Sequence, residues 1–291
     1  MSLGLKYKNS EKILEERVEN GVPYLVYPML EKTGVVKHGF TTRLGGVSKG
    51  YCSTMNISTT RGDDPEAVEE NKRRLAGAIG VRVEDMTFTH QTHTVNVAVV
   101  REEDRGRRFM ETDGMVTDVP GICLVTFYAD CVPLYLVDPV RKVIGLSHSG
   151  WRGTVNRMGQ VTLEKMQEVY GTDPKDVVAA IGPSICQDCY EVSEDVIDRF
   201  KDSFSRKDWK DLFYRKENGK YQLNLWRANE LVFWEAGILP EHIAVTNLCT
   251  HCNPDILFSH RTTGDKRGNL SALLALKEDE NDISDGTGRG R

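Results

Sequence analysis

The sequence lacks any long hydrophobic run. Of its 291 residues, 39% are hydrophobic and 28% are charged, which is ordinary for a soluble globular protein. No stretch approaches the roughly 20 apolar residues that a transmembrane helix needs. The N-terminal segment MSLGLKYKNSEKILEERVENG has no apolar core of the kind found in signal peptides. These absences predict a cytoplasmic protein that has no membrane partner.

An excess of positive charge is also missing. Lys and Arg number 38 against 43 Asp and Glu, so the net charge is −5, which argues against nucleic acid as a partner. The seven cysteines are an odd number, which argues against a closed disulfide framework. In a cytoplasmic protein we expect most of these thiols to be reduced. The absence of internal repeats excludes a solenoid.

Helical and extended patterns intermingle along the chain. We expect strands at 22–30, 177–182 and 243–248, and helices at 63–80, 159–171, 193–204 and 224–237. The first of these helices has Asp64 to cap it, Pro65 in its first turn and Gly80 to end it. The mixture predicts an α+β architecture with helices outside the sheets. No shift in composition marks a boundary, so we expect a single domain over residues 1–276. The acidic, then Gly/Arg-rich segment 277–291 is predicted to be a mobile tail.

A central hairpin carries the first candidate site. In CLVTFYADCVPLYLVDPVRKVIGLSHSGWRG, two apolar runs flank DPVR, which has a proline where a turn favours one. If Pro139 and Val140 form the tip, Cys131 lies directly opposite His148, with Cβ atoms about 5 Å apart. That spacing would let both side chains bind one zinc ion. The alternative is a buried cysteine and a histidine that caps a loop.

The motif HQTH at residues 90–93 precedes a β-branched run. Alternating Val95, Val97 and Val99 predict a strand. Residues three apart on a strand face opposite sides. His93 is in phase with the valines and is expected to point inward, whereas His90 points away. The pattern alone also fits a buried, hydrogen-bonded His93 with no role in metal binding.

Seven motifs together resemble those of one protein family. In chain order they are HGFTTRLGGVS, QTH, TDGMVT, ADCVPLYLVD, HSGWRG, IGPSICQDCYEV and CT…FSHR. They resemble the laccase-domain family, also called the multicopper polyphenol oxidase family and described as purine nucleoside phosphorylases, over roughly residues 35–276. The resemblance implies a single α/β/β/α layered domain with mixed sheets flanked by helices. It also implies a zinc site formed by His93, Cys131 and His148.

Three positions depart from the family pattern. Ser149 stands where the family usually has alanine, and His260 where it usually has tyrosine. The late TGR motif is represented by GDKRGN, which leaves the assignment of Arg267 open. These departures concern contacts with substrate more than the metal ligands.

The resemblance implies two reactions on purine nucleosides. In phosphorolysis, phosphate attacks C1′ of the ribose and the purine leaves. In deamination, zinc would acidify water for attack on C6 of adenosine with loss of ammonia. Adenosine, inosine, guanosine and methylthioadenosine are all candidate substrates, and the oligomeric state is left open.

Four residues are candidates for contacts with substrate or phosphate. Arg43 and Arg152 lie near glycines that let backbone N–H groups approach an anion. The alternative for each is a structural arginine. Asn56 and Asp113 lie in family motifs, and their alternative role is to cap turns.

Two other enzyme classes compete with this interpretation. Polyphenol oxidation would need copper, and a trinuclear copper cluster uses many imidazoles. Seven histidines and no His-x-His pair argue against it. A cysteine hydrolase could use Cys131 as nucleophile and His148 as base. Metal content separates this hydrolase from a zinc enzyme.

A non-catalytic zinc or redox module is the remaining alternative. It would use the pairs CQDC (Cys186, Cys189) and CTHC (Cys249, Cys252). Between the two pairs lie 59 residues, far more than the roughly 15–20 of a zinc ribbon. We therefore expect these four residues to be ordinary buried thiols.

Overall fold

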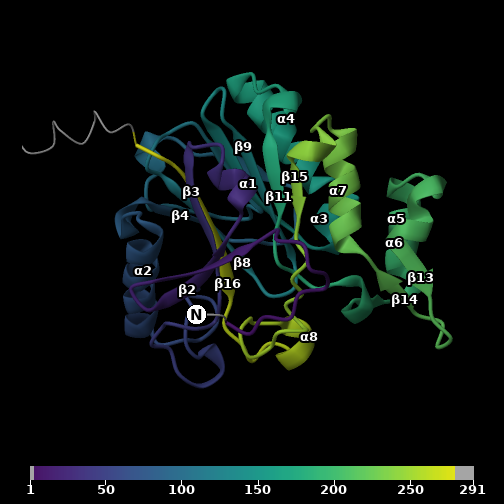
Figure 1. Ribbon diagram of the computed structural model, residues 1–291, viewed down its shortest axis with the longest axis horizontal. Coiled ribbons are helices and arrows are strands. Elements are labelled where there is room, and N and C mark those ends of the chain that lie inside the picture. Colours follow the sequence, from purple (N-terminus) through teal and green to yellow (C-terminus); the bar gives the residue numbers. More distant parts are fainter. Residues whose placement is uncertain (1–2, 279–291) are drawn as a thin grey trace, which may run out of the picture.

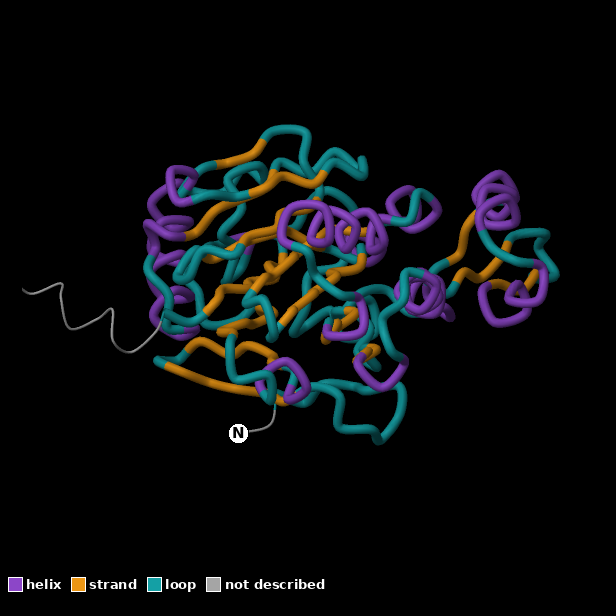
Figure 2. The backbone as a smooth tube through the Cα atoms, turned by 90° about the horizontal axis from the view of Figure 1, so that it is seen from above, coloured by secondary structure: helices purple, strands orange, loops and turns teal. Residues whose placement is uncertain are grey.

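The computed structural model describes residues 3–278. Over this range, two large β-sheets lie face to face and helices cover both outer faces (Figure 1; Figure 2). The predicted α+β class and its α/β/β/α layers are confirmed. The segment 277–291, expected to be a mobile tail, lies outside the described residues from 279 onward.

The first large sheet has seven strands in the order β1-β2-β3-β16-β8-β4-β6 within the described range. Their bounds are Glu15–Glu19 (β1), Val22–Val26 (β2), Val36–Thr41 (β3), Leu270–Leu276 (β16), Cys123–Tyr128 (β8), Met86–Thr89 (β4) and Arg108–Phe109 (β6). Pairing is antiparallel except along β8-β4-β6, which makes the sheet mixed.

The second large sheet has six strands in the order β15-β11-β9-β10-β7-β5, again counting described residues. Their bounds are Ile243–Val245 (β15), Val178–Ile181 (β11), Val132–Asp138 (β9), Val143–Ser149 (β10), Gly114–Thr117 (β7) and Val97–Val99 (β5). The pairs β11-β15 and β5-β7 are parallel. Because β11 and β15 run in the same direction, the two segments that follow them leave the sheet side by side.

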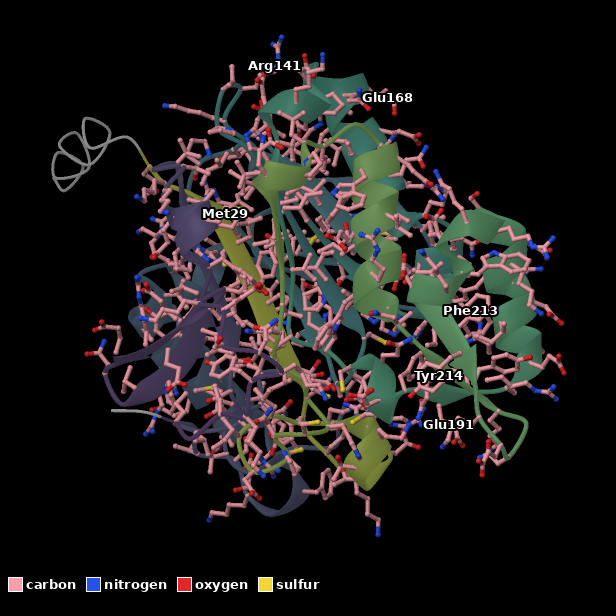
Figure 3. All side chains as sticks on the ribbon, turned by 45° about the vertical axis from the view of Figure 1, so that its right-hand side comes forward. Met29, Arg141, Glu168, Glu191, Phe213 and Tyr214 are labelled. Carbon is pink, nitrogen blue, oxygen red and sulfur yellow. The ribbon has the colours of Figure 1, made fainter. Side chains whose placement is uncertain are left out.

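A small sheet projects from one side together with two helices (Figure 1; Figure 2). Its strands are β12 (Glu191–Val192), β14 (Tyr221–Leu223) and β13 (Phe213–Arg215), and the helices are α5 (Glu194–Ser203) and α6 (Trp209–Leu212). Figure 3 shows Glu191, Phe213 and Tyr214 on this projection, well apart from Met29 in the main body. The two large sheets and the helices that cover them form the main body of the molecule.

The longer helices follow their sequence signals. In α2 (Pro65–Ile79), Asp64 accepts a hydrogen bond from the N–H of Glu66, and Gly80 ends the helix with φ +77°. In α4 (Met158–Tyr170), Gly171 has the same left-handed role. The predicted helices at 193–204 and 224–237 are α5 and α7 (Leu225–Glu235). Three shorter helices are α1 (Pro28–Glu31), α3 (Trp151–Val155) and α8 (His260–Thr263). The strand expected at 22–30 was wrong at its end, because it stops at Val26 and α1 follows.

The central strands are apolar on both faces because each face is covered. Leu134 and Leu136 of β9 pack toward α4 and α7, whereas Tyr135 and Val137 pack between the two large sheets. On the other side, α2 packs on the outer face of the seven-stranded sheet. Both large sheets are thus buried on both faces, as mixed sheets in layered folds are.

Buried tyrosines tie the two sheets together. The hydroxyl of Tyr135 donates to Gly39 O at 3.1 Å, and that of Tyr128 donates to Ser147 O at 3.0 Å. Each bond joins a side chain of one sheet to the backbone of the other. Such bonds satisfy polar groups that would otherwise be buried without a partner, so they hold the relative positions of the sheets.

The central hairpin forms, but its predicted register is wrong by two residues. Asp138 pairs with Val143 and His148 with Pro133, so Cys131 does not lie directly opposite His148. The cause is the turn: the Asp138 carboxylate accepts hydrogen bonds from the N–H groups of Val140 and Arg141, which lengthens the connection to four residues. An even shift preserves the face of each side chain.

The helices show no membrane-spanning segment. None of those between residues 3 and 278 combines the length and the apolar character that a transmembrane span requires.

A buried histidine predicts how stability depends on pH. The Nε2 atom of His38, in β3, accepts a hydrogen bond from Tyr27 N at 2.8 Å. Burial and the charge of Arg17 lower the pKa of His38 to about 3. The unfolded chain, with an ordinary histidine pKa near 6.5, therefore binds a proton between about pH 6.5 and 3 that the folded chain does not. The free energy of unfolding should fall by about 2 kcal/mol between pH 7 and 5 through His38 alone.

Replacing His38 with Gln tests this expectation, because the amide oxygen can accept the same hydrogen bond without titrating. Urea unfolding at pH 7 and 5 should show a pH-dependent loss about 2 kcal/mol smaller in His38→Gln than in the parent. His260→Gln, at an exposed position, is the matched control and should lose as much as the parent. An equal loss in all three proteins would contradict the assignment.

Candidate active site

Two histidines and a cysteine converge between the large sheets at one end. His93 lies between β4 and β5, Cys131 directly precedes β9, and His148 is in β10. Their ligand atoms all lie within 4.8 Å of one another. The distance from Cys131 Sγ to His93 Nε2 is 4.0 Å, and the two imidazole rings lie 5.0 Å apart at 87°. The structure therefore brings together the three residues expected to bind metal.

The path of the chain at His93 differs from the prediction. Residues 90–96 form a loop, and the strand begins only at Val97. His93 has φ +63°, in the left-handed region, and its side chain is exposed rather than buried in phase with the valines. The strand-phase argument was therefore wrong, although His93 lies where the three side chains converge. His90 is not a member of this group.

Asp113 explains this loop. Its fully buried carboxylate accepts hydrogen bonds from the backbone N–H groups of Thr92, His93 and Thr94, at 3.1, 3.1 and 2.9 Å. Three amides turned toward one carboxylate cannot pair in a sheet. The same carboxylate lies 2.9 Å from His148 Nδ1. Asp113 thus orients both histidines and leaves His148 Nε2 free for another partner.

Gly150 provides the space in which these side chains meet. A Cβ atom at this position would lie 3.1 Å from Cys131 Sγ and 3.2 Å from His93 Cδ2. Both contacts are tighter than side chains normally make. The glycine of the HSGWRG motif therefore favours close approach here through its lack of a side chain, since its φ of −76° is open to any residue.

The electrostatic interactions among Cys131, His148 and Asp113 favour the charged form of each. Burial opposes ionisation of the Cys131 thiol, but His148 and His93 outweigh it and lower its pKa to about 6. Burial likewise opposes charge on His148, but Cys131 and Asp113 raise its pKa to about 9. Burial also opposes charge on Asp113, but His148 and the amides of Thr94 and Thr92 lower its pKa to about 2. A thiolate between two imidazoles is a donor set that suits zinc.

Two cavities meet at His93 and Cys131. The larger, of about 280 Å³, is lined by polar and basic side chains, including Arg61, His90, Arg108, His148, Arg267 and Asn269. The smaller, of about 180 Å³, is lined by Trp151, Arg152, Tyr190, Leu225, His260 and Arg261, among others. His93 and Cys131 therefore separate a basic cavity, which His148 also lines, from one with aromatic sides.

The remaining predicted residues lie in different places. Arg152 lines the smaller cavity, with its guanidinium 4.3 Å from the ring centre of Trp151. Arg43 lines neither of the two cavities. Its guanidinium donates to Ser53 O and Pro254 O at 3.0 and 2.8 Å, and it lies over the ring of Phe258. These contacts join two loops.

Asn56 is fully buried and also joins segments. Its Oδ1 accepts hydrogen bonds from the N–H groups of Ser58 and Asn269, and its Nδ2 donates to Asp63. Since Asn269 lines the larger cavity, Asn56 supports that wall from behind.

Sequence reasoning missed Arg61 and left Arg267 open. Both line the larger cavity, and the Nε atom of each is buried with no hydrogen-bond partner within residues 3–278. Burial and the nearby charge of Arg61 lower the pKa of Arg267. The sequence offered the signal used for Arg152, because Arg61 and Arg267 each precede a glycine as well. What the sequence did not reveal is that residues 61 and 267 line the same cavity.

Comparison with known proteins identifies the family. The family model described as multi-copper polyphenol oxidoreductase laccase matches residues 37–277. The chain belongs to this family.

Relatives in the family carry enzyme names. A purine nucleoside phosphorylase from Deinococcus radiodurans is 38% identical over 260 residues, covering 89% of this chain and 95% of its own. An adenosine deaminase, RL5, from an unknown prokaryotic organism is 34% identical over 238 residues, covering 79% and 90%. The crystal structure of YlmD from Geobacillus stearothermophilus superposes with a TM-score of 0.85 at 31% identity, covering 91% of this chain and 99% of that one.

Replacing Asp113 with Asn should weaken metal binding without removing a ligand. An amide cannot accept hydrogen bonds at both ends, so the loop at His93 and the ring of His148 lose their orientation. Loss of such a supporting carboxylate typically costs 10- to 100-fold in metal affinity, and we expect a zinc Kd raised by about that factor. Competition with a chromophoric chelator measures it. Asp118→Asn, at an exposed position beyond β7, is the control, and equal Kd values for both variants would contradict the role of Asp113.

Proposed function

We propose that this protein is a zinc-dependent purine nucleoside phosphorylase that also deaminates adenosine. The observation that carries the proposal is the convergence of His93, Cys131 and His148 beside two cavities. One of these cavities is lined by Arg61 and Arg267, whose Nε atoms have no hydrogen-bond partner among the described residues. The names of the relatives support both reactions.

The three converging residues would hold the zinc ion. His148 would bind through Nε2, because Nδ1 faces Asp113, and Cys131 as a thiolate. Three protein ligands are the number that catalytic zinc sites use. When bound, zinc supplies a Lewis acid that makes water more acidic near neutral pH.

The larger cavity is suited to phosphate. Arg61, Arg267 and Arg108 line it with three guanidinium groups, and the Nε atoms of Arg61 and Arg267 are buried with no partner among residues 3–278. A guanidinium group can donate two parallel hydrogen bonds to the oxygens of one phosphate. An anion between Arg61 and Arg267 would satisfy both donors and offset the mutual repulsion of the two cations. We therefore assign the phosphate to this cavity, ahead of the predicted Arg43, whose donors already bind carbonyls.

The smaller cavity, of about 180 Å³, is suited to the purine base of a nucleoside. Trp151 and Tyr190 provide aromatic walls on which a purine can stack, and Arg152 and Arg261 lie at its border. The two cavities share His93 and Cys131, so a phosphate in one and a nucleoside in the other would meet at these residues. Arg152 stays a proposed substrate contact in this arrangement.

The metal ligands can be tested one at a time. Alanine at His93, Cys131 or His148 should remove the zinc bound at this site and both activities. His90→Ala is the matched control. It removes a neighbouring imidazole that lines the larger cavity but is not in the ligand group, so it should retain the zinc. Metal analysis of the four variants, with circular dichroism to verify folding, measures this. Zinc lost from folded His90→Ala would show that the wrong histidine was chosen.

The phosphate assignment can be tested through the ratio of two rates. Removing Arg61 or Arg267 should slow phosphorolysis about ten- to a hundred-fold, the range for a lost charge-assisted hydrogen bond of about 1.5–3 kcal/mol. Deamination has no phosphate to position and should change less. Arg→Lys should restore little if the contact needs the planar guanidinium.

Three further variants complete this comparison. Arg152→Ala and Arg43→Ala test the arginines first predicted from the sequence. Arg73→Ala, on the exposed face of α2, is the control and should leave the ratio unchanged. A ratio unaltered in both Arg61→Ala and Arg267→Ala would move the phosphate out of this cavity.

A cysteine hydrolase is the second candidate, because the Cys131 thiolate and His148 imidazole resemble the nucleophile and base of such enzymes. A free thiolate reacts rapidly with iodoacetamide, whereas one bound to zinc is protected. Zinc-loaded protein should therefore resist alkylation at Cys131. Catalytic activity that survives complete removal of zinc would favour the cysteine hydrolase.

A further inference from the structure

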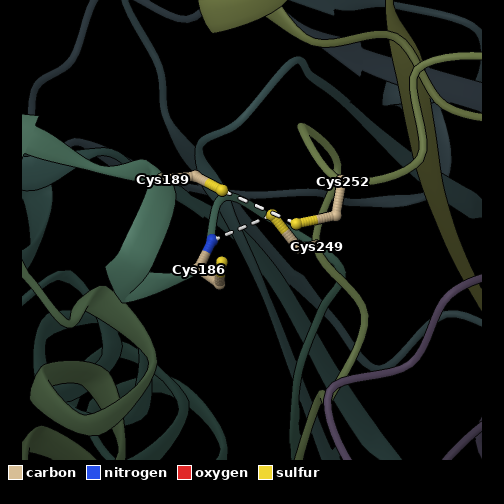
Figure 4. A group of neighbouring side chains, drawn as sticks. All are labelled: Cys186, Cys189, Cys249 and Cys252. Carbon is tan, nitrogen blue, oxygen red and sulfur yellow. Dashed lines mark hydrogen bonds between the residues drawn. The ribbon is translucent and has the colours of Figure 1, made fainter.

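Four cysteines form a second cluster in the structure. Cys186 and Cys189 come from the loop after β11, and Cys249 and Cys252 from the loop after β15 (Figure 4). Their four sulfur atoms all lie within 4.8 Å of one another, and all four thiols are free. The 59 residues between the two pairs therefore do not keep them apart in space.

Parallel pairing of β11 and β15 brings the two Cys-x-x-Cys pairs together. Ala179 pairs with Ile243 and Ile181 with Val245, and a further bridge joins Ser184 to Cys249. The two segments leave the sheet in the same direction. Cys186 and Cys249 are 63 positions apart, as are Cys189 and Cys252. The long stretch of chain between the pairs, which argued against a shared site, does not matter once both segments start from neighbouring strands.

The geometry of the cluster suits a single tetrahedral ion. Four sulfurs bound at about 2.3 Å would lie about 3.8 Å apart, and Cys189 Sγ lies 3.5 Å from Cys252 Sγ. Clusters of several iron atoms hold their cysteines further apart, because bridging sulfides lie between them. The sulfur spacing therefore favours one ion.

The surrounding groups stabilise negative charge on the sulfurs. The N–H of Cys186 donates to Cys249 Sγ at 3.2 Å. The N–H of Cys189 donates to Cys186 O at 3.1 Å, which closes the turn that carries the first pair. The ammonium of Lys8, 2.7 Å from Asp188, faces Cys186 and Cys252. This donor and the ammonium of Lys8 offset part of the net negative charge that four thiolates around a divalent ion carry.

We propose that Cys186, Cys189, Cys249 and Cys252 bind one structural zinc ion. The four thiols release their protons to solvent as the ion binds. With four protein ligands the site is closed and has no open position for a reactant. It is separate from the group His93, Cys131 and His148, and it does not depend on the proposed activity.

This ion would hold one wall of the smaller cavity. Tyr190, which lines that cavity, directly follows Cys189. From the same two loops, Ile185 N donates to Asp130 O at 3.0 Å, and Thr250 Oγ1 donates to the Asp130 carboxylate at 2.6 Å. Asp130 is the residue before Cys131 and has φ +85°. The second zinc would thus support the bend that presents Cys131 at the candidate active site.

Metal counting on the whole chain tests the proposal. Protein loaded with zinc and passed over a chelating resin should contain about two zinc ions per chain. The triple variant His93→Ala/Cys131→Ala/His148→Ala should retain about one, and Cys189→Ser/Cys252→Ser should lose one. Cys52→Ala and Cys123→Ala are matched controls, since they remove buried thiols outside both groups, and they should retain two. A zinc content in Cys189→Ser/Cys252→Ser equal to that of the parent would overturn the proposal.

A measurement on the triple variant remains informative if the cysteine variants fail to fold. Cobalt in place of zinc should give the intense near-ultraviolet charge-transfer bands of several thiolate ligands, which the first site has lost. Titration of the denatured, chelated parent should find all seven cysteines of the chain as free thiols. No metal in the triple variant, iron in place of zinc, or fewer than seven thiols, which would indicate a disulfide, would each overturn it.

Discussion

A single buried carboxylate holds the candidate active site together. Asp113 accepts hydrogen bonds from three successive backbone amides and interacts with a histidine ring, with no exposure to solvent. Its position follows from β7, which it precedes, and β7 is held by pairing with β10 and β5. The central layers of the fold thereby determine where His93 and His148 lie. The cost of burying the charge is offset by this complete set of donors.

Local signals in the sequence predicted the parts of the fold that depend on neighbours along the chain. The ends of α2 and α4 agree with their caps, because Asp64, Gly80 and Gly171 act within one turn of the helix. The layered architecture and the family followed from ordered motifs. The hairpin was found, but its register depended on which amides Asp138 would bind, a choice among several turns of similar energy.

The less successful predictions share a cause, which is contact between distant segments. The strand pattern at residues 95–99 gave no sign that Asp113 would draw residues 92–94 into a loop. Arg61 and Arg267 looked like any other arginine before a glycine until the fold placed them in one cavity. The four cysteines were judged by their separation along the chain, whereas a parallel strand pair determines their separation in space. A single sequence gives little indication of which distant segments will pair.

The parallel pairing of β11 and β15 also indicates where the chain can vary in length. The stretch between them leaves and re-enters the sheet at adjacent strands, and part of it forms the projecting sheet with α5 and α6 (Figure 1). The tip of that projection is the turn at residues 216–220, which is closed by Lys216 N and Lys220 O. Extra residues inserted there would lengthen the projection without displacing either pair of cysteines. Evolutionary insertions, or a grafted module, would be tolerated at this tip, whereas a one-residue deletion between β11 and Cys186 would misalign the cysteines.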